Sequence, residues 1–189
     1  LSASDLRFAY PDSGFSLSVA EFFAAEAEAV GIGGPSGTGK STFLRLLSGI
    51  LKPDAGSVTI CGENAARLPA GSLRALRLRR LGLVFQDFAL MPWSNVMRNV
   101  AFGLEMKGMA RSEREAIAEK YIASVGLKGF ENAYPHELSG GMRQRAGLAR
   151  ALAVNAKVLR MDEPFSAVDE QTRRKFQEDL LELIAREQK

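Results

Sequence analysis

Cysteine and histidine are almost absent from this sequence, and long apolar runs are missing. The 189 residues include one cysteine, Cys61, and one histidine, His136. A single cysteine cannot form a disulfide within the chain, which is typical of proteins from a reducing compartment. No apolar run approaches the roughly 20 residues that cross a bilayer, and the start of the chain shows no signal-peptide pattern. Any role at a membrane is therefore expected to depend on partner proteins.

The charge balance is mild. The net charge is +3, with 25% charged and 46% hydrophobic residues, which is ordinary for a globular protein. Such a small excess does not by itself indicate nucleic-acid binding, although it is compatible with a nearby anionic membrane surface. No internal repeat or low-complexity linker divides the chain, so a single domain over residues 1–189 is expected.

Short apolar strands alternate with amphipathic helices. The predicted strands lie within residues 6–19, where two strands flank a turn, and at residues 29–33, 57–61, 81–85 and 158–161. The predicted helices span residues 40–51, 112–126, 140–154 and 170–186, the second opening on a capping box at Ser112. This alternation predicts an α/β fold with a mostly parallel sheet and a small antiparallel β part at the N-terminus. A helical subdomain at about 87–153 would be inserted into a core of about 1–86 and 154–189.

A glycine-rich segment follows the predicted strand at 29–33. It reads Gly34-Pro35-Ser36-Gly37-Thr38-Gly39-Lys40-Ser41 and fits the phosphate-loop pattern G-x-x-x-x-G-K-[ST]. Glycines let backbone amides surround phosphate oxygens, and the positive end of the next helix faces the same anion. Lys40 is expected to reach the β- and γ-phosphates and Ser41 to ligate Mg²⁺, with Thr42 completing the nucleotide-binding set. A chance glycine-rich turn is the alternative, which the strand before and the helix after disfavour.

Two carboxylates follow the predicted strand at 158–161. Asp162 is expected to hold Mg²⁺ and Glu163 to polarise the attacking water as a general base. Two ordinary surface acids are the alternative, which would be preferred if no phosphate loop were present. Arg160 is unexpected in a buried strand, where it must either extend to solvent or pair with an acid.

The segment Leu138-Ser139-Gly140-Gly141-Met142-Arg143-Gln144-Arg145 resembles the signature sequence of ABC ATPases. Three further segments, in the family's order, are similar to its other motifs. They are Phe85-Gln86 for the Q-loop, Ser166-Ala167-Val168-Asp169 for the D-loop, and Tyr10 for the aromatic that stacks on adenine. The resemblance covers nearly the whole chain. It implies an ATPase with ATP and Mg²⁺ as cofactors, in which Gln86 contacts the metal and the water.

The resemblance also implies partners. Ser139, Gly140 and Gly141 would complete the ATP site of a second copy in a head-to-tail dimer. The alternative is a simple helix cap at Ser139, which is expected as well, but a cap does not need the two glycines. The chain is most similar to bacterial importers of the osmoprotectant group and of the nitrate, sulfonate and taurine group. Transmembrane permease subunits and a substrate-binding protein are then expected, with the chain peripheral at the cytoplasmic face of the inner membrane and no nucleic-acid partner. A soluble ABC ATPase acting on DNA or ribosomes, and a regulator that only binds ATP, are the rival hypotheses.

Other features have less specific interpretations. His136 precedes the signature and is expected to be a local structural residue. The arginines between Arg67 and Arg80 predict a solvated helical face, or otherwise a contact with lipid or an acidic partner. The apolar segment 88–93 could pack within the subdomain or receive a helix of a membrane subunit. The resemblance also implies a C-terminal part of the domain with a histidine that contacts the γ-phosphate, and neither is found before Lys189. The 189-residue chain is therefore expected to bind ATP but to hydrolyse it poorly. The alternative is a longer gene product that includes this part and is fully active.

Overall fold

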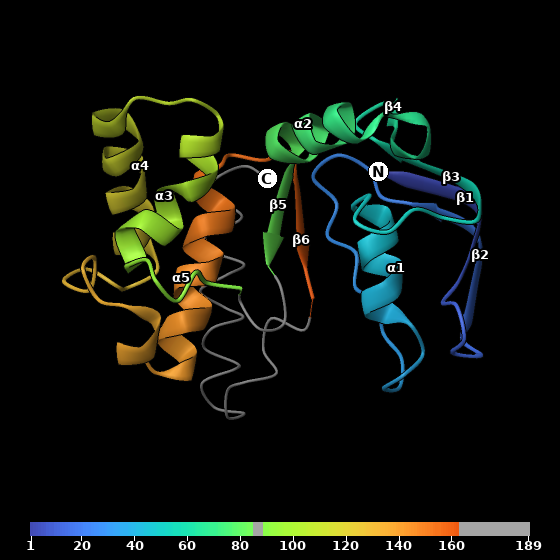
Figure 1. Cartoon of the computed structure of the whole chain (residues 1–189), viewed down its shortest axis with the longest axis horizontal. Coiled ribbons are helices and arrows are strands. Elements are labelled where there is room, and N and C mark those ends of the chain that lie inside the picture. The colour runs from blue at the N-terminus through green and yellow to red at the C-terminus, as the bar shows by residue number, and fades with distance from the viewer. Residues whose placement is uncertain (85–88, 163–189) are drawn as a thin grey trace. The chain divides into compact units, whose positions relative to one another are not determined.

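The computed structural model describes residues 1–84 and 89–162 (Figure 1). The chain divides into two compact units, the first covering residues 1–80 and the second beginning at Leu81. The predicted strand at 81–85 is described only to residue 84, and the predicted helix at 170–186 lies outside the described residues.

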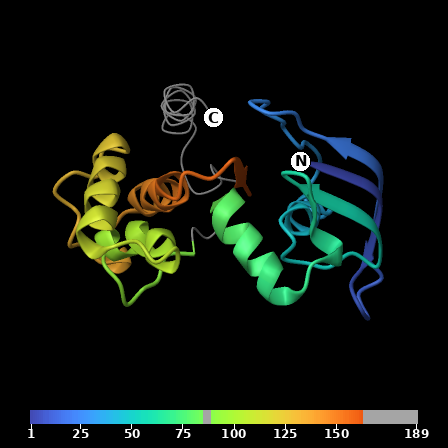
Figure 2. The ribbon, with the colours of Figure 1, turned by 90° about the horizontal axis from the view of Figure 1, so that it is seen from above.

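The first unit is built on a four-stranded antiparallel sheet. Its strands are β1 (Ser2–Ala9), β2 (Ser16–Phe23), β3 (Ala55–Ile60) and β4 (Glu63–Asn64), in the order β2-β1-β3-β4. Figure 2 shows these strands as one layer with α1 (Lys40–Leu47) on one side of it. The predicted N-terminal antiparallel part is therefore confirmed, with β1 beginning four residues earlier than expected.

Helix α1 is shorter than its apolar pattern predicted. Phe43, Leu46 and Leu47 are buried as expected for the inner face. The helix ends at Leu47 rather than at residue 51, because Gly49 turns the chain with a left-handed φ of 62°. Ile50, within the predicted helix at 40–51, is outside the observed helix and 39% exposed.

The predicted strand at 29–33 is wrong. The structure assigns no strand to these residues, and Val30 is 43% exposed. An apolar run becomes a parallel strand only when neighbouring strands pair with its amides and carbonyls. Within the first unit the sheet is entirely antiparallel, and the one described parallel pair belongs to the second unit.

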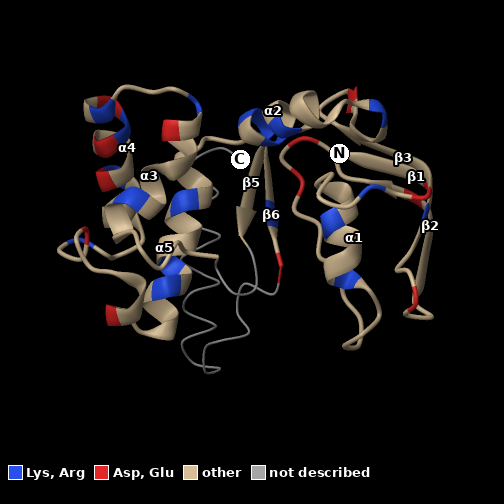
Figure 3. Ribbon diagram, in the orientation of Figure 1, with Lys and Arg blue, Asp and Glu red and all other residues tan. Residues whose placement is uncertain are grey.

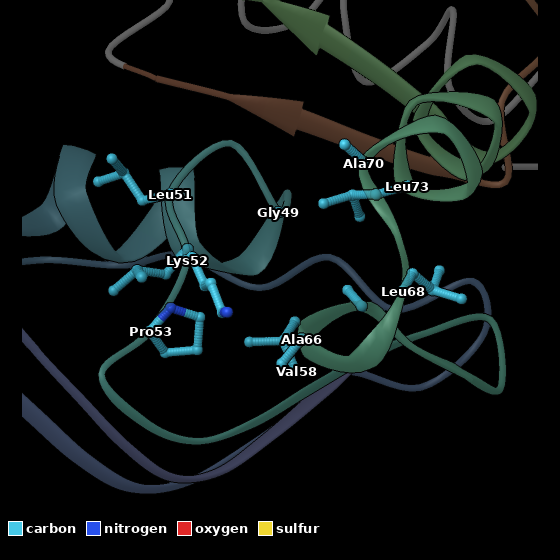
Figure 4. Close-up of a pocket in the computed structure, with 11 residues that line it drawn as sticks. Gly49, Leu51, Lys52, Pro53, Val58, Ala66, Leu68, Ala70 and Leu73 are labelled. Atoms are coloured by element: carbon cyan, nitrogen blue, oxygen red, sulfur yellow. The ribbon is translucent and has the colours of Figure 1, made fainter.

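Beyond β4 the first unit continues through η1 (Ala65–Arg67) into α2 (Ala70–Arg80). Figure 3 shows the arginines of α2 in blue, and no acidic residue lies in its sequence. A cavity of about 270 Å³ lies between the end of α1, β3 and the start of α2 (Figure 4). It is lined by aliphatic side chains such as Leu46, Val58 and Leu73, and Lys52 is the one charged residue among the described residues that line it.

The second unit combines a parallel strand pair with a helical core. Its elements are β5 (Leu81–Val84), α3 (Val96–Met106), α4 (Arg111–Ser124), η2 (Pro135–Glu137), α5 (Gly140–Ala153) and β6 (Val158–Met161). Strands β5 and β6 pair in parallel, with Leu81 opposite Val158. One apolar core joins the three α-helices, and Leu159 and Met161 of β6 pack against it. Because side chains alternate along a strand, Arg160 and Asp162 face the other way.

The capping box predicted at Ser112 is wrong. Helix α4 begins one residue earlier, with Ala110 at the cap position and no side-chain hydrogen bond there. Glu115 does not reach back to the chain before the helix; it pairs with Arg111 across one helical turn, at 2.8 Å between Nε and Oε1. The predicted end of the helix is correct, since Gly126 follows it with a φ of 70°.

None of the helices in residues 1–84 and 89–162 has the length and apolar character needed to span a bilayer.

Candidate nucleotide-binding site

The glycine segment forms an exposed loop that leads directly into α1. Gly39, at the cap position of α1, has a φ of 94°, in the left-handed region that favours glycine. A Cβ built on Gly39 would lie 2.6 Å from Cζ of Phe15, so a side chain at this position requires the Phe15 ring to shift. The close contact with Phe15 was not predicted, because no motif marks a residue 24 positions earlier as a neighbour of the loop.

Lys40 curls back over the loop. Its Nζ donates hydrogen bonds to the carbonyl oxygens of Gly34 at 2.9 Å and Pro35 at 2.8 Å. Thr38 Oγ1 also donates to the Pro35 carbonyl, at 2.9 Å. The loop therefore holds an ammonium group close to its backbone at the start of a helix. The first turn of α1 contains no acidic side chain to offset that positive charge.

Tyr10 lies against the residue that follows the loop. Its hydroxyl is 3.3 Å from Oγ1 of Thr42, at hydrogen-bonding distance. The edge of Phe8 contacts the Tyr10 ring with centroids 4.8 Å apart, and Phe15 packs beside it at 5.9 Å. The structure thus brings Tyr10 to the start of α1, 32 residues further along the chain. Its predicted stacking on adenine stays a prediction.

The start of α5 is a second helix N-terminus whose first turn carries no acidic side chain. Ser139 caps α5, and its Oγ accepts a hydrogen bond from the Met142 amide at 3.3 Å, which confirms the predicted cap. Gly140 and Gly141 form the first turn without side chains or acidic charge. Arg143 stabilises the approach to the helix by donating to the Leu138 carbonyl at 2.7 Å. The geometry is compatible with an anion at this helix end.

Asp162 lies at the end of β6. Its backbone amide donates to the Val84 carbonyl of β5 at 3.0 Å, which continues the parallel pairing by one step. Its carboxylate is buried, and its Oδ2 accepts a hydrogen bond from Nη2 of Arg160 at 3.1 Å. Of the two alternatives for Arg160, the structure shows pairing with an acid rather than extension to solvent.

The donor chemistry of these residues fits Mg²⁺. A serine hydroxyl, as in Ser41, and a carboxylate, as in Asp162, are hard oxygen donors, which this ion prefers. Among residues 1–84 and 89–162 no group of three or more His, Cys, Asp or Glu side chains could hold a metal alone.

Several predicted site residues lie outside the described residues. They are Gln86 of the Q-loop segment, Glu163 and the D-loop segment Ser166–Asp169. His136 is described, and it stacks on Tyr134 with ring centroids 5.9 Å apart, as expected of a local structural residue.

A glycine loop that curls a lysine over the N-terminus of a helix defines the class of P-loop nucleotide-binding proteins. Within that class, residues 17–166 match the family model described as ABC transporter. The chain belongs to the ABC transporter family.

Curated relatives include two groups of importers. The glycine betaine/proline betaine transport ATP-binding protein ProV of Salmonella typhimurium is 46% identical over 179 residues, 94% of this chain and 45% of the relative. The taurine import ATP-binding protein TauB of Pseudomonas syringae is 51% identical over 153 residues, 81% of this chain and 55% of the relative. The predicted resemblance to both groups is confirmed. The chain spans about half the length of the curated relatives it matches.

Solved structures confirm the ABC ATPase fold. A dimeric structure of the bacterial ABC transporter cassette MJ0796 matches with a TM-score of 0.90 at 32% identity, covering 100% of this chain and 84% of that one. A dimeric post-hydrolysis structure of the same cassette, bound to ADP and Pi, matches with a TM-score of 0.87 at 32% identity, covering 96% and 82% of the two chains.

Proposed function

We propose that this chain is the ATP-binding and ATP-hydrolysing subunit of an ABC importer, which powers solute transport through partner membrane subunits. The observation that carries the proposal is the position of Lys40, held over the glycine loop at the N-terminus of α1. The transporter relatives and the cassette structure bound to ADP and Pi support it.

ATP would bind with its phosphates in the glycine loop. Backbone amides from Gly37 to Ser41 and the Lys40 ammonium would replace water around the β- and γ-phosphates. Lys40 would exchange its two loop carbonyls for phosphate oxygens, which are stronger acceptors because they are charged. The Tyr10 ring would stack on adenine, held in place by Phe8 and Phe15.

The metal ligands would be Ser41, Asp162 and Gln86. The chemistry that Mg²⁺ supplies when bound is neutralisation of charge on the phosphate oxygens. Glu163 would accept a proton from the attacking water, and Gln86 would orient that water.

The signature turn would act on a second copy of the chain. Ser139, Gly140 and Gly141 would face the γ-phosphate held by the partner's glycine loop, so that two ATP molecules lie in a head-to-tail dimer. The capped and acid-free start of α5 supports this role, as do the dimeric cassette structures. Closure on ATP and reopening after hydrolysis would then drive transport.

The finer architecture and the partners follow from the same proposal. Residues 1–86 and 154–189 would form a core with a mostly parallel sheet, and residues 87–153 its helical subdomain.

Permease subunits would dock near the segment at 88–93, where Trp93 is 75% exposed. A substrate-binding protein would deliver a betaine or a sulfonate such as taurine, and the chain would be peripheral at the cytoplasmic face of the membrane.

Nucleotide binding by the 189-residue chain tests the proposal. Titration with a fluorescent ATP analogue in Mg²⁺ should give saturable binding, and Lys40→Ala should weaken it by about tenfold or more. Lys128→Ala, which removes the same charge from an exposed loop, is the matched control and should bind normally. Unchanged affinity in Lys40→Ala would refute the assignment of the loop.

A further inference from the structure

Arg160 is a charged residue in an otherwise apolar strand. The other residues of β6 are Val158, Leu159 and Met161, and the strand paired with it has Leu83 opposite Arg160. The Arg160 side chain is only 6% exposed. Parallel strands of this kind are normally aliphatic, and removing a guanidinium from water is costly unless it is paired. The presence of Arg160 therefore requires a partner that compensates for its burial.

One such partner is Asp162, which follows two residues later, directly after β6. Because side chains at positions i and i+2 share a face, Arg160 and Asp162 lie next to each other. Nη2 of Arg160 is 3.1 Å from Oδ2 of Asp162, and the Asp162 side chain is 7% exposed. Leu159 and Met161 occupy the opposite face, against the helical core. Burial lowers the local dielectric constant, which strengthens the attraction between the two charges.

The same carboxylate is the proposed magnesium ligand. Two cations, one supplied by the chain and one by solution, would thus share a single negative charge. We infer that Arg160 is a positioning residue for Asp162: it holds the carboxylate at the end of β6 and lowers its affinity for the divalent metal. The inference rests on the proposed function, in which Asp162 binds the metal.

Two effects of opposite sign follow. A neutral side chain at position 160 leaves Asp162 as a buried charge without this cation, so the metal-free protein becomes less stable. The same change removes one cation from beside the carboxylate, so the metal competes with less positive charge and binds more tightly. A purely structural role for Arg160 predicts instead that stability and metal affinity fall together.

The experiment compares Arg160→Gln with Arg160→Lys in the whole 189-residue chain. Binding of Mn²⁺ in the presence of saturating ADP is followed by the electron paramagnetic resonance signal of free Mn²⁺. Arg160→Gln should bind Mn²⁺ on the order of tenfold more tightly than the unsubstituted chain, as expected for the loss of a nearby positive charge. Arg160→Lys keeps the charge and should stay within about threefold of the unsubstituted chain. Equal or weaker binding by Arg160→Gln, or tightening by Arg160→Lys of the same size, would overturn the inference.

Thermal unfolding with and without Mn²⁺ and ADP provides a second measurement. Arg160→Leu supplies the aliphatic side chain typical of such strands, and it can be purified with Mn²⁺ and ADP bound. Saturating Mn²⁺ with ADP should raise its unfolding temperature by more than it raises that of the unsubstituted chain, because ligand stabilisation follows affinity. An equal or smaller increase would contradict the inference.

The two proposals fail in different ways. If the unsubstituted chain binds no Mn²⁺ with ADP, the proposed nucleotide function is wrong. If it binds Mn²⁺ and the neutral variants do not tighten that binding, only the role of Arg160 is wrong.

Discussion

At the scale of single residues, the nucleotide loop depends on contacts with the N-terminal hairpin. Phe15, at the end of the turn before β2, lies so close to Gly39 that a side chain there would displace its ring. Tyr10 reaches Thr42 from the same hairpin. The loop that would bind phosphate is thus shaped partly by aromatic residues that belong to no phosphate-binding motif.

Gly39→Ala should therefore reduce both stability and nucleotide binding. An alanine at a left-handed φ costs about 1–2 kcal/mol, and here its Cβ would also overlap the Phe15 ring. Urea unfolding and ATP titration measure the two losses. Gly37→Ala is the matched control, because Gly37 also has a positive φ but a Cβ added there would meet nothing within 4 Å. Equal unfolding free energies for the two variants would show that the Phe15 contact is unimportant.

Two substitutions of Tyr10 distinguish the contribution of its ring to ATP binding from that of its hydroxyl. Tyr10→Phe removes the contact with Thr42 but keeps the aromatic face, so ATP affinity should change by about twofold or less. Tyr10→Leu removes the face and should weaken binding by about 5- to 30-fold, the range expected for loss of roughly 1–2 kcal/mol of base stacking. Isothermal titration with ATP gives both values. Similar affinities for the two variants would exclude stacking on adenine.

At the scale of elements, the start of α5 has a structural role as a helix cap and, in the proposed function, a second role in contacting the partner's ATP. Ser139 caps the helix through the Met142 amide, and Arg143 holds the preceding turn. An uncapped helix of this kind loses about 1 kcal/mol, so a Ser139 substitution affects stability whether or not Ser139 contacts ATP. The two roles must therefore be separated by choosing the replacement.

A comparison of Ser139→Asp with Ser139→Ala distinguishes helix capping from contact with the partner's ATP. Aspartate caps a helix as well as serine does, so Ser139→Asp should keep the unfolding free energy, whereas Ser139→Ala should lose about 1 kcal/mol. Both variants should bind ATP normally as monomers, because the proposed contact is with the partner's nucleotide.

Turnover should fall in both variants, and most in Ser139→Asp, because its carboxylate repels the γ-phosphate. Steady-state ATPase activity and chemical denaturation give the two readouts. Normal turnover in Ser139→Asp, or a loss of monomer ATP affinity like that of Lys40→Ala, would contradict a role across the dimer interface.

At the scale of the whole molecule, the proposed mechanism requires two copies of the chain. Each copy has one glycine loop and one signature turn, located in different units. The matched cassette structures are dimeric. Association of the chain should therefore depend on ATP rather than on a permanent apolar interface.

Glu163→Gln should trap the associated state. The amide keeps the shape of the side chain but cannot accept a proton from water, so ATP binds and is not hydrolysed. Size-exclusion chromatography with light scattering should show a dimer in ATP and a monomer without it. The double variant with Lys40→Ala should stay monomeric in both conditions. A Glu163→Gln monomer at saturating ATP would argue against the closed dimer.

Local sequence determined the parts of the fold that depend on neighbouring residues. The glycine loop, the Ser139 cap, the hairpin of β1 and β2 and the strand at 158–161 were all predictable, because their hydrogen bonds or periodicity lie within a few residues. Three predictions were wrong: the end of α1, the start of α4 and a strand at residues 29–33. Residues 29–33 form no strand because strand pairing depends on neighbours that the local pattern does not contain. The two helix boundaries were misplaced because the apolar pattern was followed past Gly49 and the helix was assumed to open on a side-chain cap at Ser112.

The sequence by itself thus determined the family of this protein and the residue types of its nucleotide site, since both are encoded in short ordered motifs. Only the tertiary structure decided how those residues are held. Phe15 meets Gly39 and Tyr10 meets Thr42, and in both pairs the partners are far apart along the chain. Arg160 pairs with Asp162 instead of extending to solvent, because its side chain is buried and a buried guanidinium without an opposite charge is strongly unfavourable.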